Sequence, residues 1–407
     1  MTREVAYKVW KLYLEKGVFL SKGIEREIKK VSLSDQNMAF LFELLYGTCR
    51  QKAFIESIIK RFVKRKRTPS FALISLGVYQ ILFMRSVTDY AAVNESVEVA
   101  KKCGLKRESA FINAVLRKVV SEKSKLKVVP SDKELKNASL VASYLSYPEW
   151  IVKKIHFGFG TKKGNNILAS LNKPAFVPLH FFNTNKCVDK KKDYTISDID
   201  EEVFVMSPSQ KASVDMLEIK KGLKVLDLCS SPGGKARVIE HLLKGNGELV
   251  CVEKNIKKLR LQKKYRETKA LKLCNSKIRT NFLCADVTYV NEIFLSGYFD
   301  RIMLDVPCSN TGEMSKCPEV RWRLKEADIK RLSKIQFLML KSSSKLIKKN
   351  GLLIYSTCSL FEEENKNVVS KFLEDERNFF LEEEEIVTPN LKSPFGGYHA
   401  KIRKVTT

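Results

Sequence analysis

The chain has 407 residues, of which 44% are hydrophobic, and its formal net charge is +28 at pH 7. This length exceeds one hydrophobic core, so several domains are expected, and the apolar content is sufficient to build them. The positive charge is spread along the chain and argues against an enzyme that handles only neutral small molecules. Nucleic acid is the expected partner, with an ordinary basic, solvated surface as the alternative.

No apolar run approaches the roughly 20 residues of a membrane span, and no signal segment opens the chain. We therefore expect a cytoplasmic protein with no membrane partner. The 10 cysteines include neither a Cys-x-x-Cys pair nor a Cys/His spacing typical of zinc. No metal site and no disulfide framework are expected, and most of these cysteines are expected to be small buried residues.

Residues 1–125 are expected to form an all-helical bundle. Apolar residues recur at helical spacing in the first 14 residues and near 37–46, 53–63, 70–84 and 91–101. Ser34 is the expected N-cap of the helix that begins near Gln36, and Gly47 lies near its expected end. Residues 1–130 hold 26 basic and 12 acidic residues. The densest basic run, residues 61–67, is either a phosphate contact or a solvated helix end.

Residues 126–200 are expected to be a linker and adaptor. From residue 201 to 407, strands alternate with helices. Strands are expected at 224–228, 249–252, 280–284, 301–306, 352–355, 379–387 and 398–402. This order predicts an α/β fold with a mostly parallel seven-stranded sheet and helices on both faces. Ligands of such folds bind at the carboxyl ends of the strands.

The first of these strands is followed by a glycine turn, Cys229-Ser230-Ser231-Pro232-Gly233-Gly234-Lys235, and then by a helix. The two glycines would allow a ligand to approach the backbone. Glu253 ends the next strand, where a carboxylate would hold ribose hydroxyls, and Asp286 follows the third. The turn matches neither the phosphate-binding nor the dinucleotide pattern, and acids crowd it. The cationic S-adenosylmethionine is therefore the expected cofactor, with a plain strand-to-helix turn as the alternative.

Two cysteines follow expected strand ends. Cys308 lies in Asp305-Val306-Pro307-Cys308-Ser309, and Cys358 lies in Ser356-Thr357-Cys358-Ser359. A thiolate is a strong, soft nucleophile, and two cysteines at a ligand-binding edge indicate covalent catalysis. The alternative for each is a small residue packed at a strand end. Their spacing does not decide which of the two would attack.

These motifs together resemble the RNA cytosine-5 methyltransferases of the Fmu/Sun/Nop2 (RsmB-type) family. Residues 45–50, 76–83, 91–97 and 111–117 resemble the NusB-like domain of its bacterial 16S ribosomal RNA methyltransferase B group. The resemblance covers nearly the whole chain. It implies a NusB-like RNA-binding bundle followed by a Rossmann-like, S-adenosylmethionine-dependent domain that methylates a cytosine of 16S ribosomal RNA.

The resemblance also implies a role for each matching residue. Cys358 would add to C6 of the cytosine, Cys308 would take part in releasing the enzyme, and Asp305 would bond the base near N3 while also lying beside the cofactor. Cytosine methyltransferases that act on DNA use a Pro-Cys cysteine as nucleophile, so this order of the two cysteines depends on the family match.

On the cofactor side, the resemblance places the turn from Cys229 to Lys235 at the methionine, Glu253 at the ribose and Asp286 near the adenine. The family often has aspartate where this chain has Glu253, and the longer side chain should still reach. A monomer is expected. Transfer RNA as the substrate and a non-catalytic RNA-binding scaffold remain open as alternatives.

Overall fold

The computed structural model describes residues 1–63, 68–126, 129–176, 178–181, 187–189, 203–267 and 278–405. The chain divides into two compact units. The first contains residues 1–174 and 314–323, and the second contains residues 175–313 and 324–407. Each is described by itself. Most of the basic run at 61–67 lies outside the described residues, as do residues 127–128 and 190–202. The expected domain boundaries near 125 and 200 therefore stay predictions.

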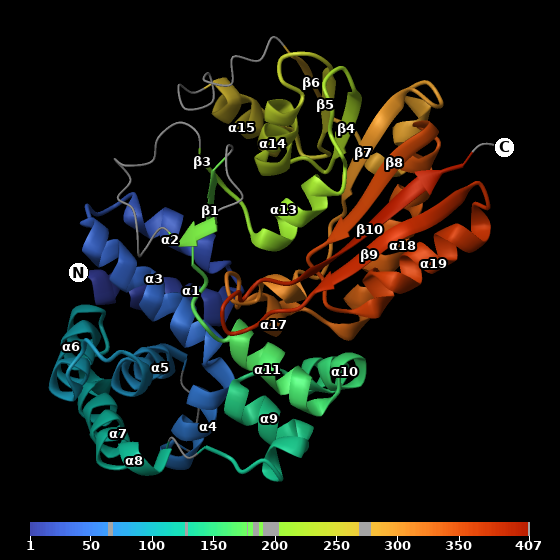
Figure 1. The fold of residues 1–407 in the computed structure, drawn as a ribbon. Helices are drawn as coiled ribbons and strands as arrows, with labels where there is room; N and C mark the ends of the chain where they lie inside the picture. The colour runs from blue at the N-terminus through green and yellow to red at the C-terminus, as the bar shows by residue number, and fades with distance from the viewer. Residues whose placement is uncertain are drawn as a thin grey trace. The chain divides into compact units, whose positions relative to one another are not determined.

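The first unit is helical (Figure 1). Its core contains the buried side chains of Trp10, Leu44, Ile58, Leu76 and Leu116, which come from five different helices. The all-helical prediction for the N-terminal region is confirmed. The helices are α1 (Thr2–Lys16), α2 (Leu20–Ile28), α3 (Asp35–Arg50), α4 (Lys52–Phe62), α5 (Thr68–Phe83), α6 (Asp89–Lys102), α7 (Ser109–Ser121), α8 (Lys123–Leu126), α9 (Ala138–Leu145), α10 (Glu149–Phe159), α11 (Thr161–Leu171) and α17 (Val320–Arg323), with 3-10 turns η1 (Lys106–Glu108) and η2 (Glu134–Lys136).

Helix α3 begins as expected and ends near its glycine, as expected. The hydroxyl of Ser34 accepts a hydrogen bond from the backbone N–H of Asn37, which confirms the N-cap. The helix continues past Gly47 to Arg50. A Cβ on Gly47 would lie 2.0 Å from the Tyr79 hydroxyl, so this glycine allows α5 to pack closely against α3. A packing requirement, and not a helix end, explains it.

Residues 314–323 belong to the helical unit although they follow Cys308 in sequence. The guanidinium of Arg321 is fully buried and donates to Asn172 Oδ1 at 2.6 Å and to the carbonyl of Ser146 at 3.3 Å. It also lies over the ring of Tyr147, 3.8 Å from the centroid. Since a buried cation needs such partners, this cluster holds the segment in the helical unit.

The second unit contains a seven-stranded sheet in the order β6-β5-β4-β7-β8-β10-β9 (Figure 1). Strand β10 runs antiparallel to β8 and β9, and the other strands of this sheet all run in one direction. This confirms the mostly parallel sheet and each of the expected strands to within a few residues. The strands are β4 (Lys224–Leu228), β5 (Glu248–Val252), β6 (Arg279–Leu283), β7 (Phe299–Asp305), β8 (Ile347–Thr357), β9 (Phe379–Val387) and β10 (Gly397–Lys404). A separate small sheet has the order β2-β1-β3, formed by Cys187–Asp189, Pro178–Phe181 and Val203–Val205.

Alternate residues of the strands face different helices, as the two-residue period of a strand requires. Val225 packs on the side of α13 (Pro208–Asp215) and α14 (Gly234–Leu242). Leu226 packs on the side of α18 (Glu326–Ser344) and α19 (Lys366–Asp375). Helix α15 (Ile256–Glu267) contacts β6. Both faces are therefore covered, and the carboxyl ends of the parallel strands share one edge.

The acidic run Glu382–Glu385 lies on β9, the edge strand. Glu382 forms ion pairs with Lys401 and Arg403 of β10, and Glu384 accepts a hydrogen bond from the Tyr398 hydroxyl. Charged side chains on an edge strand discourage pairing with another chain.

In the part of the chain that the structure describes, no helix is long and apolar enough to cross a membrane. Among the same residues, no group of three or more His, Cys, Asp or Glu is arranged to hold a metal ion.

Candidate active site

The turn between β4 and α14 has a shape that requires a glycine at Gly233. Its φ of 105° lies in the left-handed region, and a Cβ there would approach the Gln262 side chain of α15 to 2.8 Å. Gln262 Oε1 accepts hydrogen bonds from the hydroxyls of Ser230 at 3.0 Å and Ser231 at 3.2 Å. Helix α15 thus holds the turn in place. Sequence reasoning missed Gln262, because a polar residue on a basic helix gives no signal of its own.

Gly234 is different, since none of the residues that the structure describes requires a glycine there. It is the first residue of α14, and a Cβ would find its nearest neighbour, Met206 Cε, at 3.7 Å, which is ordinary van der Waals contact. The described residues therefore tolerate a methyl group at Gly234, and this glycine remains a candidate for close approach by a ligand at the amino end of a helix.

The predicted acids Glu253, Asp286 and Asp305 all follow or end strands at the carboxyl edge of the sheet. Glu253 is nearly buried, and its Oε1 accepts from the backbone N–H of Asn255 at 2.8 Å. Asp286 caps the 3-10 turn η4 (Val287–Glu292) and pairs with Lys254 Nζ at 2.6 Å. Burial works against its charge, but the hydrogen bonds from Lys254 and Thr288 outweigh burial and lower the pKa of Asp286. Asp286 is therefore ionised at neutral pH.

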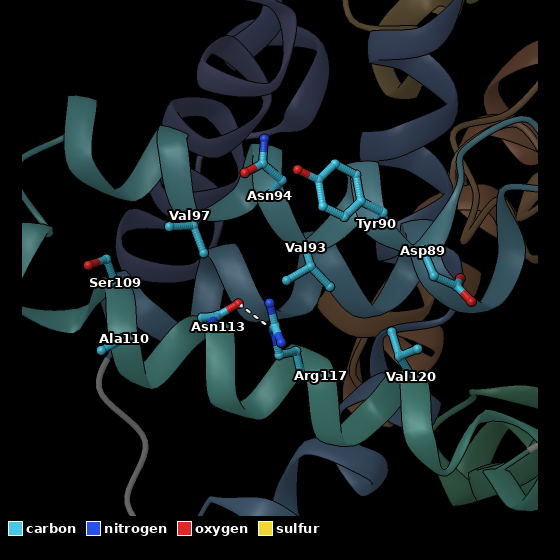
Figure 2. Close-up of a pocket in the computed structure, with 10 residues that line it drawn as sticks. All are labelled: Asp89, Tyr90, Val93, Asn94, Val97, Ser109, Ala110, Asn113, Arg117 and Val120. Carbon is cyan, nitrogen blue, oxygen red and sulfur yellow. Dashed lines mark hydrogen bonds between the residues drawn. The ribbon is translucent and has the colours of Figure 1, made fainter.

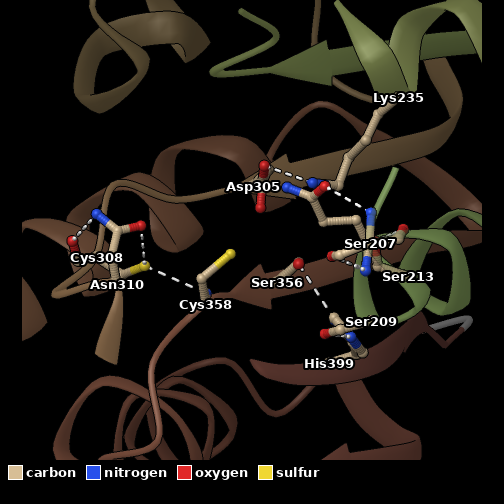
Figure 3. A network of polar contacts seen from close by, with 11 residues as sticks. Ser207, Ser209, Ser213, Lys235, Asp305, Cys308, Asn310, Ser356, Cys358 and His399 are labelled. Atoms are coloured by element: carbon tan, nitrogen blue, oxygen red, sulfur yellow. Dashed lines mark hydrogen bonds and ion pairs between the residues drawn. The ribbon is translucent and has the colours of Figure 1, made fainter. Parts of the chain in front are cut away.

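Lys235 and Asp305 form an ion pair at the centre of the site, with Nζ 2.6 Å from Oδ2 (Figure 3). Burial disfavours the charge of Lys235, but Asp305 raises its pKa, so the ammonium persists. Asp305 keeps a side-chain exposure of 25%, whereas Lys235 has only 7%. The aspartate is thus the member of the pair that a substrate can reach. The sequence placed Lys235 in the cofactor turn without this partner.

Asp227, which sequence reasoning did not select, lies close to this pair. It is fully buried on β4, and neither of its carboxylate oxygens has a hydrogen-bond partner among the described residues. Burial raises the pKa of Asp227 to about 8, with Lys235 lowering it and Asp305 raising it. Asp227 is therefore protonated and neutral at neutral pH, so Asp305 is the carboxylate that pairs with the charged Lys235. The signal available in the sequence was an acid inside an otherwise apolar strand.

We expect Asp227→Asn to flatten the pH dependence of stability. Between about pH 4 and pH 8 the folded protein keeps the Asp227 proton that the unfolded chain has lost, so the wild type loses stability as the pH rises. The asparagine variant lacks this loss, which amounts to at most about 1.4 kcal/mol per pH unit. Denaturant unfolding at pH 5, 6.5 and 8 measures it. Parallel pH profiles for the two proteins would contradict the protonated state.

The two cysteine loops are in contact at the ends of neighbouring strands. Asp305 of β7 pairs with Ser356 of β8 in the parallel ladder, so the segments that follow them run side by side. The backbone N–H of Cys358 donates to Cys308 Sγ at 3.2 Å, and both side chains are partly exposed (Figure 3). A hydrogen bond with Cys308, together with burial, raises the pKa of Cys358 well above its usual range. At rest Cys358 is therefore a neutral thiol.

Buried Glu364 ties the two loops together behind the cysteines. Its carboxylate accepts from the backbone N–H of Ser309 at 2.8 Å and from the hydroxyl of Ser359. The two serine hydroxyls lie 3.0 Å apart, and Gln336 donates a further bond to Glu364 at 3.0 Å. The serines that follow each cysteine in the motifs are thus structural: they fix the position of Cys308 relative to Cys358.

His399 of β10 supports the strand that carries Cys358. Its ring nitrogens lie 3.0 Å from the Ser209 hydroxyl and 3.2 Å from the Ser356 hydroxyl (Figure 3). Burial and the nearby Lys235 lower the pKa of His399 to about 4. It is neutral at pH 7 and acts as a hydrogen-bonding link between α13 and β8.

Comparison with known protein families gives two matches. Residues 214–402 match the model described as 16S rRNA methyltransferase RsmB/F, and residues 1–121 match the NusB family. A Bacillus subtilis protein named "Probable ribosomal RNA small subunit methyltransferase B" is 29% identical, over 86% of this chain and 83% of its own length. The "Ribosomal RNA small subunit methyltransferase B" of Yersinia enterocolitica is 27% identical, over 99% of this chain and 98% of its own.

Solved structures support the fold. The crystal structure of PH0851 superposes with a TM-score of 0.76 at 20% identity and covers 99% of both chains. A methyltransferase homologue from Pyrococcus horikoshii has a TM-score of 0.56 at 19% identity and covers 68% of this chain and all of its own. At these identities the likeness concerns the arrangement of helices and strands alone.

Proposed function

Residues 214–402 belong to the 16S rRNA methyltransferase RsmB/F family and residues 1–121 to the NusB family, and from this premise we propose that the protein methylates C5 of a cytosine in 16S ribosomal RNA. The family makes the chain an RNA methyltransferase that uses S-adenosylmethionine. The base, the ring position and the covalent route are the content of the proposal, as are the roles of the individual residues.

The contact between Cys308 and Cys358 carries this proposal. One sulfur accepts the backbone N–H of the other cysteine at 3.2 Å, and both lie on the strand edge that holds Asp305. A single nucleophile would suffice to make a covalent bond. A second cysteine, whose sulfur contacts the backbone of the first, supports a reaction in which one bond is made and a second group assists when that bond is broken.

The residues supply the following chemistry. Cytosine C5 is a poor nucleophile until a thiolate adds to C6, and Cys358 is the proposed thiol. Because its pKa is raised, Cys358 is a neutral thiol, and its proton must pass to a base as the sulfur bonds to C6; the carboxylate of Asp305 is the proposed acceptor. With that proton, Asp305, held by Lys235, can donate a hydrogen bond to the ring near N3 and stabilise the negative charge that develops there. After methylation, Cys308 is placed to take part in loss of the C5 proton and release of Cys358.

The turn and the acids fit S-adenosylmethionine. Gly234 provides a backbone position without a side chain at the amino end of α14, and the carboxylates of Glu253 and Asp286 lie at the ends of the next two strands. Acidic side chains suit a cofactor with positive sulfur and amino groups better than an anionic dinucleotide. Bound there, it supplies an electrophilic methyl group. Cys229 to Lys235 would hold its methionine part, Glu253 its ribose, and Asp286 would lie near its adenine.

Bisulfite mapping of RNA tests the proposal. Ribosomal and transfer RNA from cells with and without the gene are compared, and one cytosine of 16S ribosomal RNA is expected to lose its methyl mark when the gene is absent. Loss of a mark from transfer RNA instead would change the substrate but keep the chemistry. Unchanged RNA and no measurable binding of S-adenosylmethionine to the purified chain would favour a non-catalytic scaffold.

Gly234→Ala is expected to weaken cofactor binding without harming the fold. The added methyl group fits the protein, and alanine favours a helix over glycine, so the unfolding temperature should stay the same or rise slightly. If the cofactor approaches the backbone here, its affinity should fall about tenfold. Isothermal titration with S-adenosylmethionine measures this, with Gly158→Ala on α10 as the control, since an added Cβ on that helical glycine meets no described atom within 4 Å. Unchanged affinity would show that the methionine part of the cofactor does not bind beside Gly234.

A further inference from the structure

Helices α6 and α7 of the helical unit enclose a groove of about 560 Å³ (Figure 2). Val93, Val97 and Val120 provide apolar surface in it. Polar side chains complete the lining: Asp89, Tyr90, Asn94, Ser109, Asn113 and Arg117. Its volume lies in the range of roughly 300–1,000 Å³ that is usual for small-ligand sites.

Two segments that the sequence resemblance singled out meet in this groove. Residues 91–97 lie on α6 and contribute Val93, Asn94 and Val97, while residues 111–117 lie on α7 and contribute Asn113 and Arg117. Helix packing explains only their buried members, such as Ala92 and Leu116. Asn94 and Arg117 are exposed, so these polar residues have no role in the core.

The charges of the groove favour an anionic ligand. Asp89 at one end is paired with Lys123 at 2.7 Å, so its charge is balanced. Arg117 forms no ion pair with a carboxylate among the residues that the structure describes. Its Nε donates to Asn113 Oδ1 at 3.2 Å, which orients the guanidinium and leaves N–H groups for a ligand (Figure 2). The guanidinium of Arg117 is thus oriented for an anionic group, and the one carboxylate among the described lining residues, Asp89, is already paired with a lysine.

The remaining features match a nucleobase. The side chain of Tyr90 is 78% exposed at the groove, where its ring offers a stacking surface. The amides of Asn94 and Asn113 can each donate and accept hydrogen bonds, as the edges of unpaired bases require. The valines offer an apolar surface for the flat face of a base. A free metabolite anion would not need the exposed aromatic ring.

We propose that the α6–α7 groove binds an unpaired nucleotide of the RNA substrate, with its base against Tyr90 and its phosphate at Arg117. This inference rests on the proposed function, in that the substrate is RNA. It adds a contact in the helical unit that recognises a single-stranded segment separate from the cytosine to be methylated.

Binding of a fluorescein-labelled, unstructured oligoribonucleotide to the full chain tests this by fluorescence anisotropy. Tyr90→Ala and Arg117→Gln should each raise Kd about tenfold, as loss of one stacked base or one phosphate contact does. Arg117→Gln should also lower the salt slope of log Kd by about one, whereas Tyr90→Ala should leave it unchanged. Both residues are exposed, so the unfolding temperature and S-adenosylmethionine affinity should stay at wild-type values.

Controls remove the same groups from elsewhere on the helical unit. Arg26→Gln on α2 removes an exposed guanidinium, and Phe157→Ala on α10 removes an aromatic ring that is 91% exposed. Wild-type RNA affinity in Tyr90→Ala and Arg117→Gln would overturn the proposal that this groove binds RNA, while leaving the methyltransferase proposal intact. Equal weakening of single-stranded and duplex RNA would overturn base recognition. A wild-type chain that does not bind RNA at all would defeat the proposed function itself.

Discussion

Cys358→Ala is expected to abolish methyl transfer to 16S ribosomal RNA, with a loss of roughly a thousandfold or more. Unless a thiolate adds to C6, the C5 carbon is too weak a nucleophile to attack the methyl group. The variant should still bind S-adenosylmethionine, because Cys358 lies on the base side of Asp305 in the proposed geometry. Transfer of a tritiated methyl group to RNA from gene-deletion cells measures the effect.

Cys103→Ala is the matched control for this substitution. Cys103 is also a free, partly buried cysteine, but it lies at the end of α6 in the helical unit. Its loss should leave the rate unchanged. Substantial methyl transfer by Cys358→Ala would remove this cysteine as the nucleophile, and a matching loss in Cys308→Ala without a trapped complex would assign the attack to Cys308.

Cys308→Ala is expected to trap the enzyme on its RNA. The attacking thiol is intact in this variant, so the bond to C6 forms and the methyl group is transferred, but the group that assists release is gone. A protein–RNA complex that survives denaturing electrophoresis should accumulate in near one-to-one amount, while turnover falls to a single round. Labelled RNA and labelled S-adenosylmethionine report the complex and the methyl group in the same band.

The double variant Cys308→Ala/Cys358→Ala decides whether that complex is the proposed one. It should form none, because the bond requires the Cys358 sulfur. A complex of equal amount in the double variant would place the covalent bond elsewhere. Free turnover by Cys308→Ala would show that release needs no second thiol, and the 3.2 Å contact with Cys358 would then be structural.

Much of the fold could be predicted from periodicity. Buried parallel strands are short apolar runs, and each of the expected strands from Lys224 to Lys404 lies within a few residues of an observed one. The strand-end positions of Cys308, Cys358 and Asp305 followed, because parallel strands bring their carboxyl ends to one edge. The packing role of Gly47 could not be predicted, since this glycine meets a tyrosine thirty-two positions further along the chain, and local spacing carries no trace of that contact.

The residues that position the site were not visible in the sequence. Gln262, Glu364 and His399 each contact a residue far away in the chain, 31, 55 and 190 positions from them respectively, and each sits in a helix, turn or strand whose pattern is explained without it. Asp227 alone left a sign, an acid in an apolar strand. Its protonated state depends on complete burial beside Lys235 and Asp305, which no linear pattern reports.

The sequence by itself determined the two kinds of domain, the strands, and the residues with reactive groups, because hydrophobic period, turn residues and side-chain chemistry are local properties. Tertiary structure decided how those groups are held: the contact of the Cys308 sulfur with the Cys358 backbone, the pairing of Lys235 with Asp305, the meeting of residues 91–97 and 111–117 in one groove, and the place of residues 314–323 in the helical unit. These features depend on distances between side chains far apart in the chain, and only packing sets such distances.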